Sequence, residues 1–124
     1  MVGLRPHLNF KENKIISITS KVRQSFVRTS SGQMQKLISG TAANITKANI
    51  MNVFAQASAA DAEIKIYNEI GSGATAAKLI FHGKFATAAN QVHEFKLPGA
   101  GIYADTGIYA DVTNCDFFYI VGTF

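Results

Sequence analysis

The chain contains no tryptophan, one cysteine and two prolines in its 124 residues. The single cysteine, Cys115, excludes an intrachain disulfide, so folding cannot depend on oxidation. We expect Cys115 to be a half-buried apolar side chain rather than a reactive thiol. No apolar run is long enough to span a bilayer, and the first residues lack the hydrophobic segment of a signal peptide. The sequence therefore predicts a soluble protein, made in the cytoplasm, without a membrane contact.

Charged residues are also few, at 16% of the chain, whereas 48% of the residues are hydrophobic. This composition is that of a folded globular chain, and the length suits one domain. The charges are unevenly distributed: residues 1–36 carry a net +6, residues 37–124 carry −2, and no Lys or Arg follows Lys96. A basic beginning and an acidic end can meet within one subunit or between neighbouring subunits.

One pentapeptide occurs twice near the end of the chain, as Gly101–Asp105 and Gly107–Asp111. The copies are six residues apart, so they keep the same phase on an extended strand, whose side chains alternate between two faces. This alternation predicts one aliphatic face and one face with tyrosine and aspartate. The first holds Ile102, Ala104, Ile108, Ala110 and Val112, and the second holds Tyr103, Asp105, Tyr109 and Asp111.

The final run, residues 117–124, is apolar on both faces of a strand. Such a strand must be covered on both sides, here by a second sheet and by another element. Turn residues at Val112–Asn114 precede it, so the sequence predicts a core hairpin at this end of the chain. The two phases of the run are Phe117, Tyr119 and Val121, and Phe118, Ile120 and Phe124.

The beginning of the chain predicts an extended basic arm over residues 1–12, followed by one long or broken strand over 14–27. Lys21, Arg23 and Ser25 share one face of that strand, a pattern that would suit a nucleic-acid surface. No aromatic side chain for base stacking lies on this face, because Phe26 points the other way and is expected in the core. We therefore do not expect nucleic-acid binding.

The segment 41–60 is compatible with two structures. Ile50, Val53, Phe54 and Ala57 fit one face of a helix, but three asparagines oppose a helix. We interpret the segment as a strand, with Ile50 and Val53 on opposite faces.

Further strands are expected at 34–39, 63–67, 77–85 and 92–97, with loops and turns at 30–32, 71–75, 87–90 and 98–99. Within these, Gly83 suggests a β-bulge. About eight short strands with turns roughly every 8–12 residues predict an all-β fold, an antiparallel β-sandwich that is jelly-roll-like. We expect one such domain over residues 13–124, preceded by the arm.

No pattern typical of catalysis or metal binding is present. His7, His82 and His93 do not have the spacing of zinc ligands, and no nucleophile motif accompanies them. Asp105 and Asp111 would bind Ca²⁺ if adjacent strands brought them together, but we favour solvated acids beside turns. We therefore expect no enzyme, no cofactor and no metal.

A series of short motifs occurs in one order along residues 39–124. This order of motifs resembles that of the small β-sandwich structural proteins of tailed bacteriophages. The motifs are Ser39-Gly40, Ile50, Val53, Ile64-Lys-Ile-Tyr67, Ala77-Lys-Leu-Ile80, Phe95-Lys-Leu-Pro98, Gly101-Ile102 and Thr106-Gly-Ile-Tyr-Ala-Asp-Val-Thr113.

The resemblance implies a structural protein of the virion rather than an enzyme. Within that class we favour a capsid decoration (cement) protein, which forms a homo-oligomer, often a trimer, and binds the major capsid protein. The alternatives are a tail, baseplate or fibre-adaptor subunit, or a carbohydrate-binding module of a receptor-binding tip, although the absence of tryptophan weighs against the last.

Three groups of residues are candidates for contacts between subunits. Basic residues of the arm can face an acidic neighbour, tyrosines can act as anchors, and the final aromatic strand can form an interface. The candidates are Arg5, Lys11 and Lys14; Tyr103 and Tyr109; and Phe117, Phe118 and Phe124.

Overall fold

The computed structural model describes residues 21–71, 74–85 and 91–124. The predicted arm, the strand residues up to Ser20 and the turn at 87–90 lie outside the described residues. The described part consists of eleven strands and one short 3₁₀ helix, η1 (Ala76–Lys78). The strands are β1 (Val22–Gln24), β2 (Gly32–Gln33), β3 (Gln35–Ile38), β4 (Thr41–Asn44), β5 (Ala48–Ala57), β6 (Ala62–Tyr67), β7 (Leu79–Phe85), β8 (Val92–Lys96), β9 (Ile102–Ala104), β10 (Tyr109–Thr113) and β11 (Cys115–Thr123).

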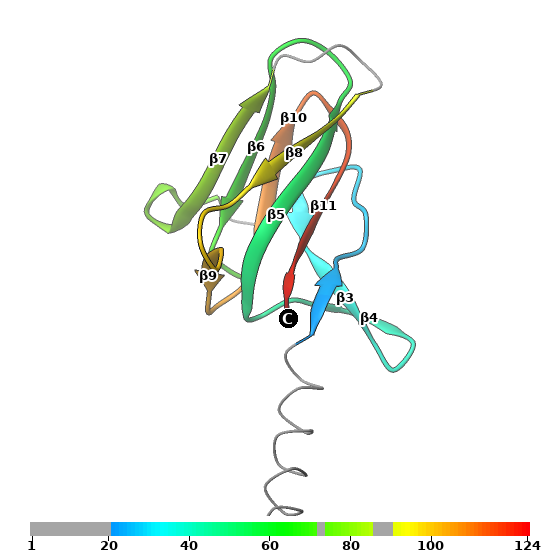
Figure 1. The fold of residues 1–124 in the computed structure, drawn as a ribbon, viewed down its shortest axis with the longest axis vertical. Helices are drawn as coiled ribbons and strands as arrows, with labels where there is room; N and C mark the ends of the chain where they lie inside the picture. The colour runs from blue at the N-terminus through cyan, green and yellow to red at the C-terminus, as the bar shows by residue number, and fades with distance from the viewer. Residues whose placement is uncertain (1–20, 72–73, 86–90) are drawn as a thin grey trace, which may run out of the picture.

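The strands form two facing antiparallel sheets (Figure 1). The five-stranded sheet has the order β1-β11-β5-β8, and β9 pairs with the beginning of β5 beyond the end of β8. The four-stranded sheet has the order β2-β10-β6-β7. With β9 and the separate β3–β4 pair set aside, the eight remaining strands have the arrangement of a jelly roll, in which the first strand pairs with the last. The predicted all-β sandwich is therefore confirmed.

The hydrophobic core lies between the two sheets. Alternate residues of each strand point inward, as the period of two requires. Each large side chain in this layer contributes on the order of 1.5–3 kcal/mol through its removal from water. Its fully buried members include Met34, Ile45, Ile50, Val53, Ile64, Ile66, Ile108, Phe118 and Ile120.

The predicted C-terminal hairpin is wrong, because the strands concerned belong to different sheets. The first copy of the pentapeptide contains β9, which pairs with β5, and the second contains β10, which pairs with β6 and β2. β11 then returns to the five-stranded sheet. The chain therefore crosses between the sheets at Asn114, whose φ of 55° lies in the left-handed region. Local alternation determines which side chains point inward, but it does not determine which sheet a strand joins.

The interpretation of 41–60 as strand is confirmed by β4 and β5, but the assignment of faces within β5 is wrong. Ile50 and Val53 are both fully buried although three residues separate them. The register explains this: Val121 pairs with Asn52, and Gly122 pairs with Ile50. The additional residue, Met51, forms a β-bulge that moves the following side chains to the other phase.

The faces expected around Ser25 and Phe26 are also reversed. Ser25 is only 2% exposed, whereas Phe26 is 39% exposed. The Ser25 hydroxyl accepts a hydrogen bond from the Ile120 amide at 3.0 Å and donates one to the Phe26 carbonyl at 3.2 Å. The next amide, that of Phe26, bonds to the Gln35 carbonyl, so pairing with β11 is interrupted here and resumes at Arg28, which exchanges two backbone bonds with Phe118. Ser25 is therefore buried, whereas Lys21 is exposed and Arg23 half-buried, so the three side chains do not form one exposed face.

Two expectations for residues 77–85 need correction. The strand begins at Leu79 rather than Ala77, because η1 precedes it. The bulge lies at Ile80 rather than Gly83, since Ile66 pairs with Phe81 and Tyr67 with Leu79. Gly83 instead makes room for an aromatic side chain, because a Cβ atom there would lie 2.7 Å from the Phe95 ring.

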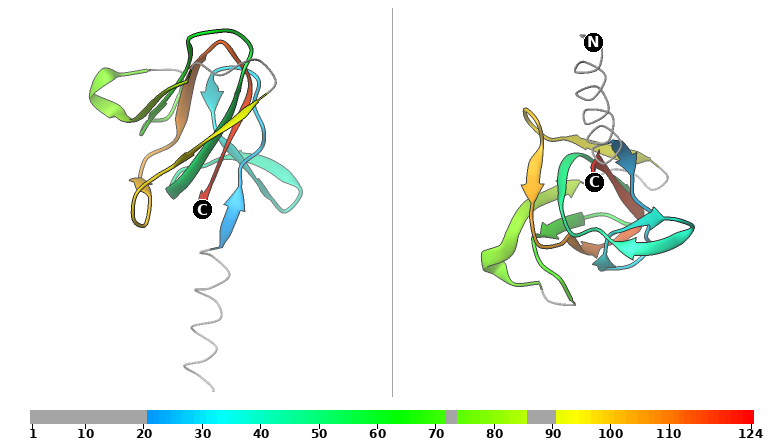
Figure 2. Two further views of the ribbon diagram at one scale, coloured as in Figure 1. Left: turned by 45° about the horizontal axis from the view of Figure 1, so that its top comes forward. Right: turned by 90° about the horizontal axis from the view of Figure 1, so that it is seen from below.

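The β3–β4 hairpin projects from the sandwich (Figure 2). Ser39 and Gly40 connect its strands, with φ values of 48° and 82°. Two successive residues with positive φ are typical of the type I′ turn that joins tightly connected strands. Leu37 and Ile38 beside the turn are about half exposed, at 52% and 48%.

Candidate interaction surfaces

The first candidate surface is the outer face of the five-stranded sheet, and Figure 1 looks onto it. In the described part of the chain, no helix or strand is layered over this face. At its centre the rings of Phe54 on β5 and Tyr119 on β11 stack, with their centroids 4.8 Å apart. Phe117 and Val121 on β11 also point outward and are half-buried. The face combines aromatic rings with amide side chains, among them Asn49, Asn52 and Gln56.

A hollow of about 270 Å³, which we call the Tyr103 hollow, lies at the end of this face. Asn49 pairs with Tyr103 on β9 and with Thr123 on β11, so these three side chains lie in a row across three adjacent strands. Two lysines complete the site, and no acidic residue lines it. The lining residues are Lys36, Thr46, Lys47, Ala48, Asn49, Tyr103, Thr123 and Phe124.

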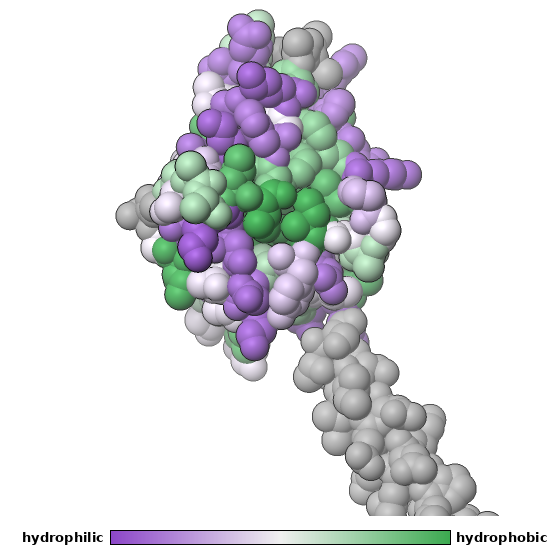
Figure 3. All heavy atoms as spheres, turned by 90° about the vertical axis from the view of Figure 1, so that its left-hand side faces the viewer, coloured by the Kyte–Doolittle hydropathy of each residue, from purple (hydrophilic) through white to green (hydrophobic). Residues whose placement is uncertain are grey.

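A second surface lies where the last strands of the two sheets, β7 and β8, face each other. Rings from both strands pack between them: Phe95 contacts Phe81 at 5.3 Å and Phe85 at 5.7 Å, centroid to centroid. His93 stacks on Phe85. Figure 3 shows a hydrophobic patch with a hydrophilic border on this side. We call this surface the open side and define it by Ile80, Phe81, Phe85, His93, Phe95 and Leu97.

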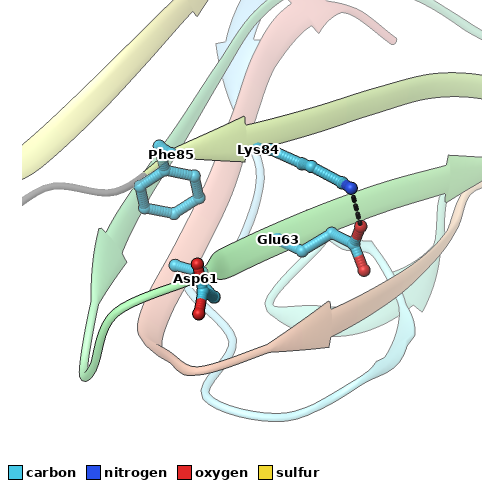
Figure 4. A pocket seen from close by; sticks show the side chains of 5 residues that line it. Asp61, Glu63, Lys84 and Phe85 are labelled. Atoms are coloured by element: carbon cyan, nitrogen blue, oxygen red, sulfur yellow. Dashed lines mark ion pairs between the residues drawn. The ribbon is translucent and has the colours of Figure 1, made fainter.

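A pocket of about 450 Å³ adjoins Phe85 and is lined by Asp61, Ala62, Glu63, Lys84 and Phe85 (Figure 4). Glu63 Oε2 lies 2.6 Å from His82 Nε2 and 3.9 Å from Lys84 Nζ. The hydrogen bond with His82 has the largest effect and lowers the pKa of Glu63; desolvation raises it, and the positive charges of Lys65, His82 and Lys84 lower it again, so that the pKa is lowered overall. The group is an ion-pair cluster on the outer face of the four-stranded sheet, with no nucleophile among its members.

The remaining chemistry-bearing groups are separate from one another. Asp105 accepts hydrogen bonds from Asn68 and Thr106, and these bonds lower its pKa. Asp111 lies on β10 and accepts a bond from Ser31, so the repeat does not place the two aspartates together as a cation site. Over residues 21–71, 74–85 and 91–124, no three His, Cys, Asp or Glu side chains form a group that could hold a metal.

Cys115 is half-buried and packs against the core, as expected from the sequence. Burial raises the pKa of its thiol, which opposes formation of the reactive thiolate. Among the described residues, no helix is long and apolar enough to cross a membrane.

The structure distributes the predicted contact residues over different environments. Tyr103 is 57% exposed, and Phe117 is half-buried on the outer face. Tyr109 belongs to the other sheet, where its ring contacts Tyr67 at 6.4 Å. Phe118 and Phe124 are core side chains, with 0% and 7% exposure, because the phase that contains them faces the second sheet. Arg5, Lys11 and Lys14 lie outside the described residues.

Sequence reasoning identified Tyr103 but missed the residues around it. Asn49 and Thr123 are 54 and 20 positions away from Tyr103, and only strand pairing brings them together. Lys36 comes from the β3–β4 hairpin. The only local sign of these residues in the sequence is the alternation of the polar Lys47 and Asn49 with the apolar Ala48 and Ile50 at the beginning of β5.

The sequence matches no protein family model, and no curated protein or solved structure matches it significantly.

Proposed function

We propose that this chain is a structural subunit of a virion, and specifically a capsid decoration protein that binds the major capsid protein as a homo-oligomer. Two observations support the proposal. The order of motifs over residues 39–124 resembles small phage structural proteins, and the jelly roll is a fold that viral capsid domains and lectins use. Since one fold can serve many functions, the surface has to carry the argument.

The open side is the observation that carries the proposal. Phe85 is buried there, whereas Ile80, Phe81, Phe95 and Leu97 pack against the core and remain partly exposed. Within the described residues no further strand closes the gap between β7 and β8. A contiguous apolar patch with a polar border is typical of a protein–protein interface. We assign the open side to the contact between copies in a trimer, and the basic arm with Arg5, Lys11 and Lys14 to the capsid.

The test is the solution mass of the protein by light scattering, together with co-sedimentation with capsids of its major capsid protein. We expect a trimer, and we expect Ile80→Gln on the open side to shift the mass toward the monomer. The matched control is Val27→Gln. Val27 is 51% exposed and lies near β1 and β2, the edge strands opposite β8 and β7 in their sheets. A version without residues 1–12 should remain a trimer and lose capsid binding.

Hydrogen exchange on the unaltered protein supplies a second measurement, in case Ile80→Gln disturbs folding. Amides of β7 and β8 should become protected as the protein concentration rises through the range of association. A protein that stays monomeric at every concentration and does not sediment with capsids would contradict the proposal.

A further inference from the structure

We propose that the Tyr103 hollow binds an acidic sugar, a single pyranose ring that carries a carboxylate. The inference goes beyond the capsid role and does not depend on it, because none of the residues that line the hollow belongs to the open side. It rests on the side chains that line the hollow and on their strand register.

An exposed aromatic ring is the first part of the site. The Tyr103 side chain is 57% exposed although its neighbour Ala104 is fully buried. β9 lies close against β5, because a Cβ atom on Gly101 would lie 2.3 Å from the Ile50 carbonyl oxygen. The ring therefore projects from a firmly held strand and offers a flat apolar surface to the C–H groups of a sugar.

Polar side chains beside the ring provide hydrogen bonds to hydroxyl groups. Asn49 pairs directly with Tyr103, and Thr123 pairs with Asn49, so an amide and a hydroxyl group follow the ring in one row. Thr46 adds a second hydroxyl group to the lining. Amide and hydroxyl groups both donate and accept, as the hydroxyl groups of a sugar require.

The charge of the lining selects an anionic ligand. Lys36 from β3 and Lys47 before β5 both line the hollow, and its lining contains no Asp or Glu. The two lysine ammonium groups, with no Asp or Glu side chain among the lining residues, favour a ligand with a carboxylate over a neutral sugar.

The dimensions favour a sugar over an acidic peptide. The hollow measures about 270 Å³, below the range of about 300–1,000 Å³ that is typical for drug-sized ligands, and suits one ring. A peptide bound by strand addition needs a long free edge, whereas β9 at this position contains only three residues, Ile102–Ala104.

The experiment is an NMR titration of ¹⁵N-labelled full-length protein with glucuronic acid, N-acetylneuraminic acid and glucose. We expect saturable shifts at Asn49, Tyr103 and Thr123 with one of the acidic sugars, and a dissociation constant on the order of 1 mM for a ligand of this size. Glucose should bind about threefold to fivefold more weakly, because it lacks the charge.

Single substitutions distinguish the contribution of the Tyr103 ring to binding from that of the lysine charges. Tyr103→Ala should abolish the shifts with all three sugars, and Phe26→Ala is its control, as an exposed aromatic residue outside the hollow. Lys47→Gln should weaken the binding of the acidic sugar about threefold to fivefold and leave the binding of glucose unchanged. Lys96→Gln, on β8 and outside the hollow, should change neither.

Three outcomes would overturn the inference. They are the absence of saturable shifts with either acidic sugar, shifts that persist in Tyr103→Ala, and binding of a Glu-rich tetrapeptide in place of the sugars. All are measured on the isolated protein, so a failure of capsid co-sedimentation leaves this result unaffected, and a failure here leaves the capsid role unaffected.

Discussion

At the scale of single residues, Glu63 shows how strand pairing creates an electrostatic environment. Lys65 shares its face of β6, and the register with β7 places Lys84 opposite Glu63 and His82 opposite Lys65. One carboxylate therefore lies within 4 Å of three basic side chains. These contacts favour the ionised form of Glu63, which is why its pKa is lowered.

We predict an acid-dependent loss of stability that involves Glu63. Its pKa in the folded protein lies below the ordinary value of 4.5, so its contribution to stability is present above 4.5 and is lost as the pH falls through the folded-state pKa. Carboxyl NMR titration should show this low pKa, and Glu63→Gln should make the acid-induced loss of stability less steep. Glu94→Gln, on the other sheet, is the control. A Glu63 titration at or above 4.5 would contradict the prediction.

At the scale of structural elements, a crossing between the sheets replaces the C-terminal hairpin that the sequence suggested. The crossing after β10 depends on Asn114, whose backbone is left-handed and whose amide side chain donates a hydrogen bond to the Ala60 carbonyl at 2.9 Å. The Asn114 carbonyl in turn accepts a bond from the Ser58 amide. These two bonds join the β10–β11 crossing to the β5–β6 crossing, so one turn residue positions both.

We predict that Asn114→Ala destabilises the protein by about 1–3 kcal/mol, since a left-handed backbone costs an alanine about 1–2 kcal/mol and a hydrogen bond is lost as well. Asn114→Gly should cost only about 1 kcal/mol or less, because glycine adopts this conformation without strain. Urea denaturation measures both values. Equal destabilisation by the two substitutions would show that the backbone conformation is not the cause.

At the scale of the whole molecule, β11 joins β1, the first strand of the described chain, to β5, an inner strand of the five-stranded sheet. It pairs with β1 on one side and with β5 on the other. The close approach of β5 requires Gly122, since a Cβ atom there would lie 2.0 Å from the Asn49 carbonyl oxygen. The last residue, Phe124, is buried at the same end of the sandwich.

We predict that a version that ends at Ile120 lacks cooperative unfolding, because it loses every pair with β1 and the pairs of β5 with Val121–Thr123. Far-UV circular dichroism during heating measures this loss. Phe124→Leu is the control, because it keeps these pairs and should still unfold cooperatively, at a cost of about 1 kcal/mol. A truncated protein with an unchanged transition would show that the sandwich is stable without this end of β11.

The sequence by itself determined the features that depend on local patterns. Alternation identified β6, β8 and β10 and the inward faces of both pentapeptide copies, because side chains of a strand alternate whatever its partner. The single cysteine ruled out an internal disulfide, and Pro98-Gly99 marked a turn that the structure confirms, with a hydrogen bond from the Gly101 amide to the Pro98 carbonyl.

Only the tertiary structure decided how these elements combine. A bulge at Met51 reversed the phase within β5, and Asn114 directed β11 into the opposite sheet from β10. The row of Tyr103, Asn49 and Thr123 exists because β9 and β11 both pair with β5. The physical reason is that alternation acts between neighbours in the chain, whereas sheet membership follows from pairing and packing between distant segments, which leave no periodic signal in the sequence.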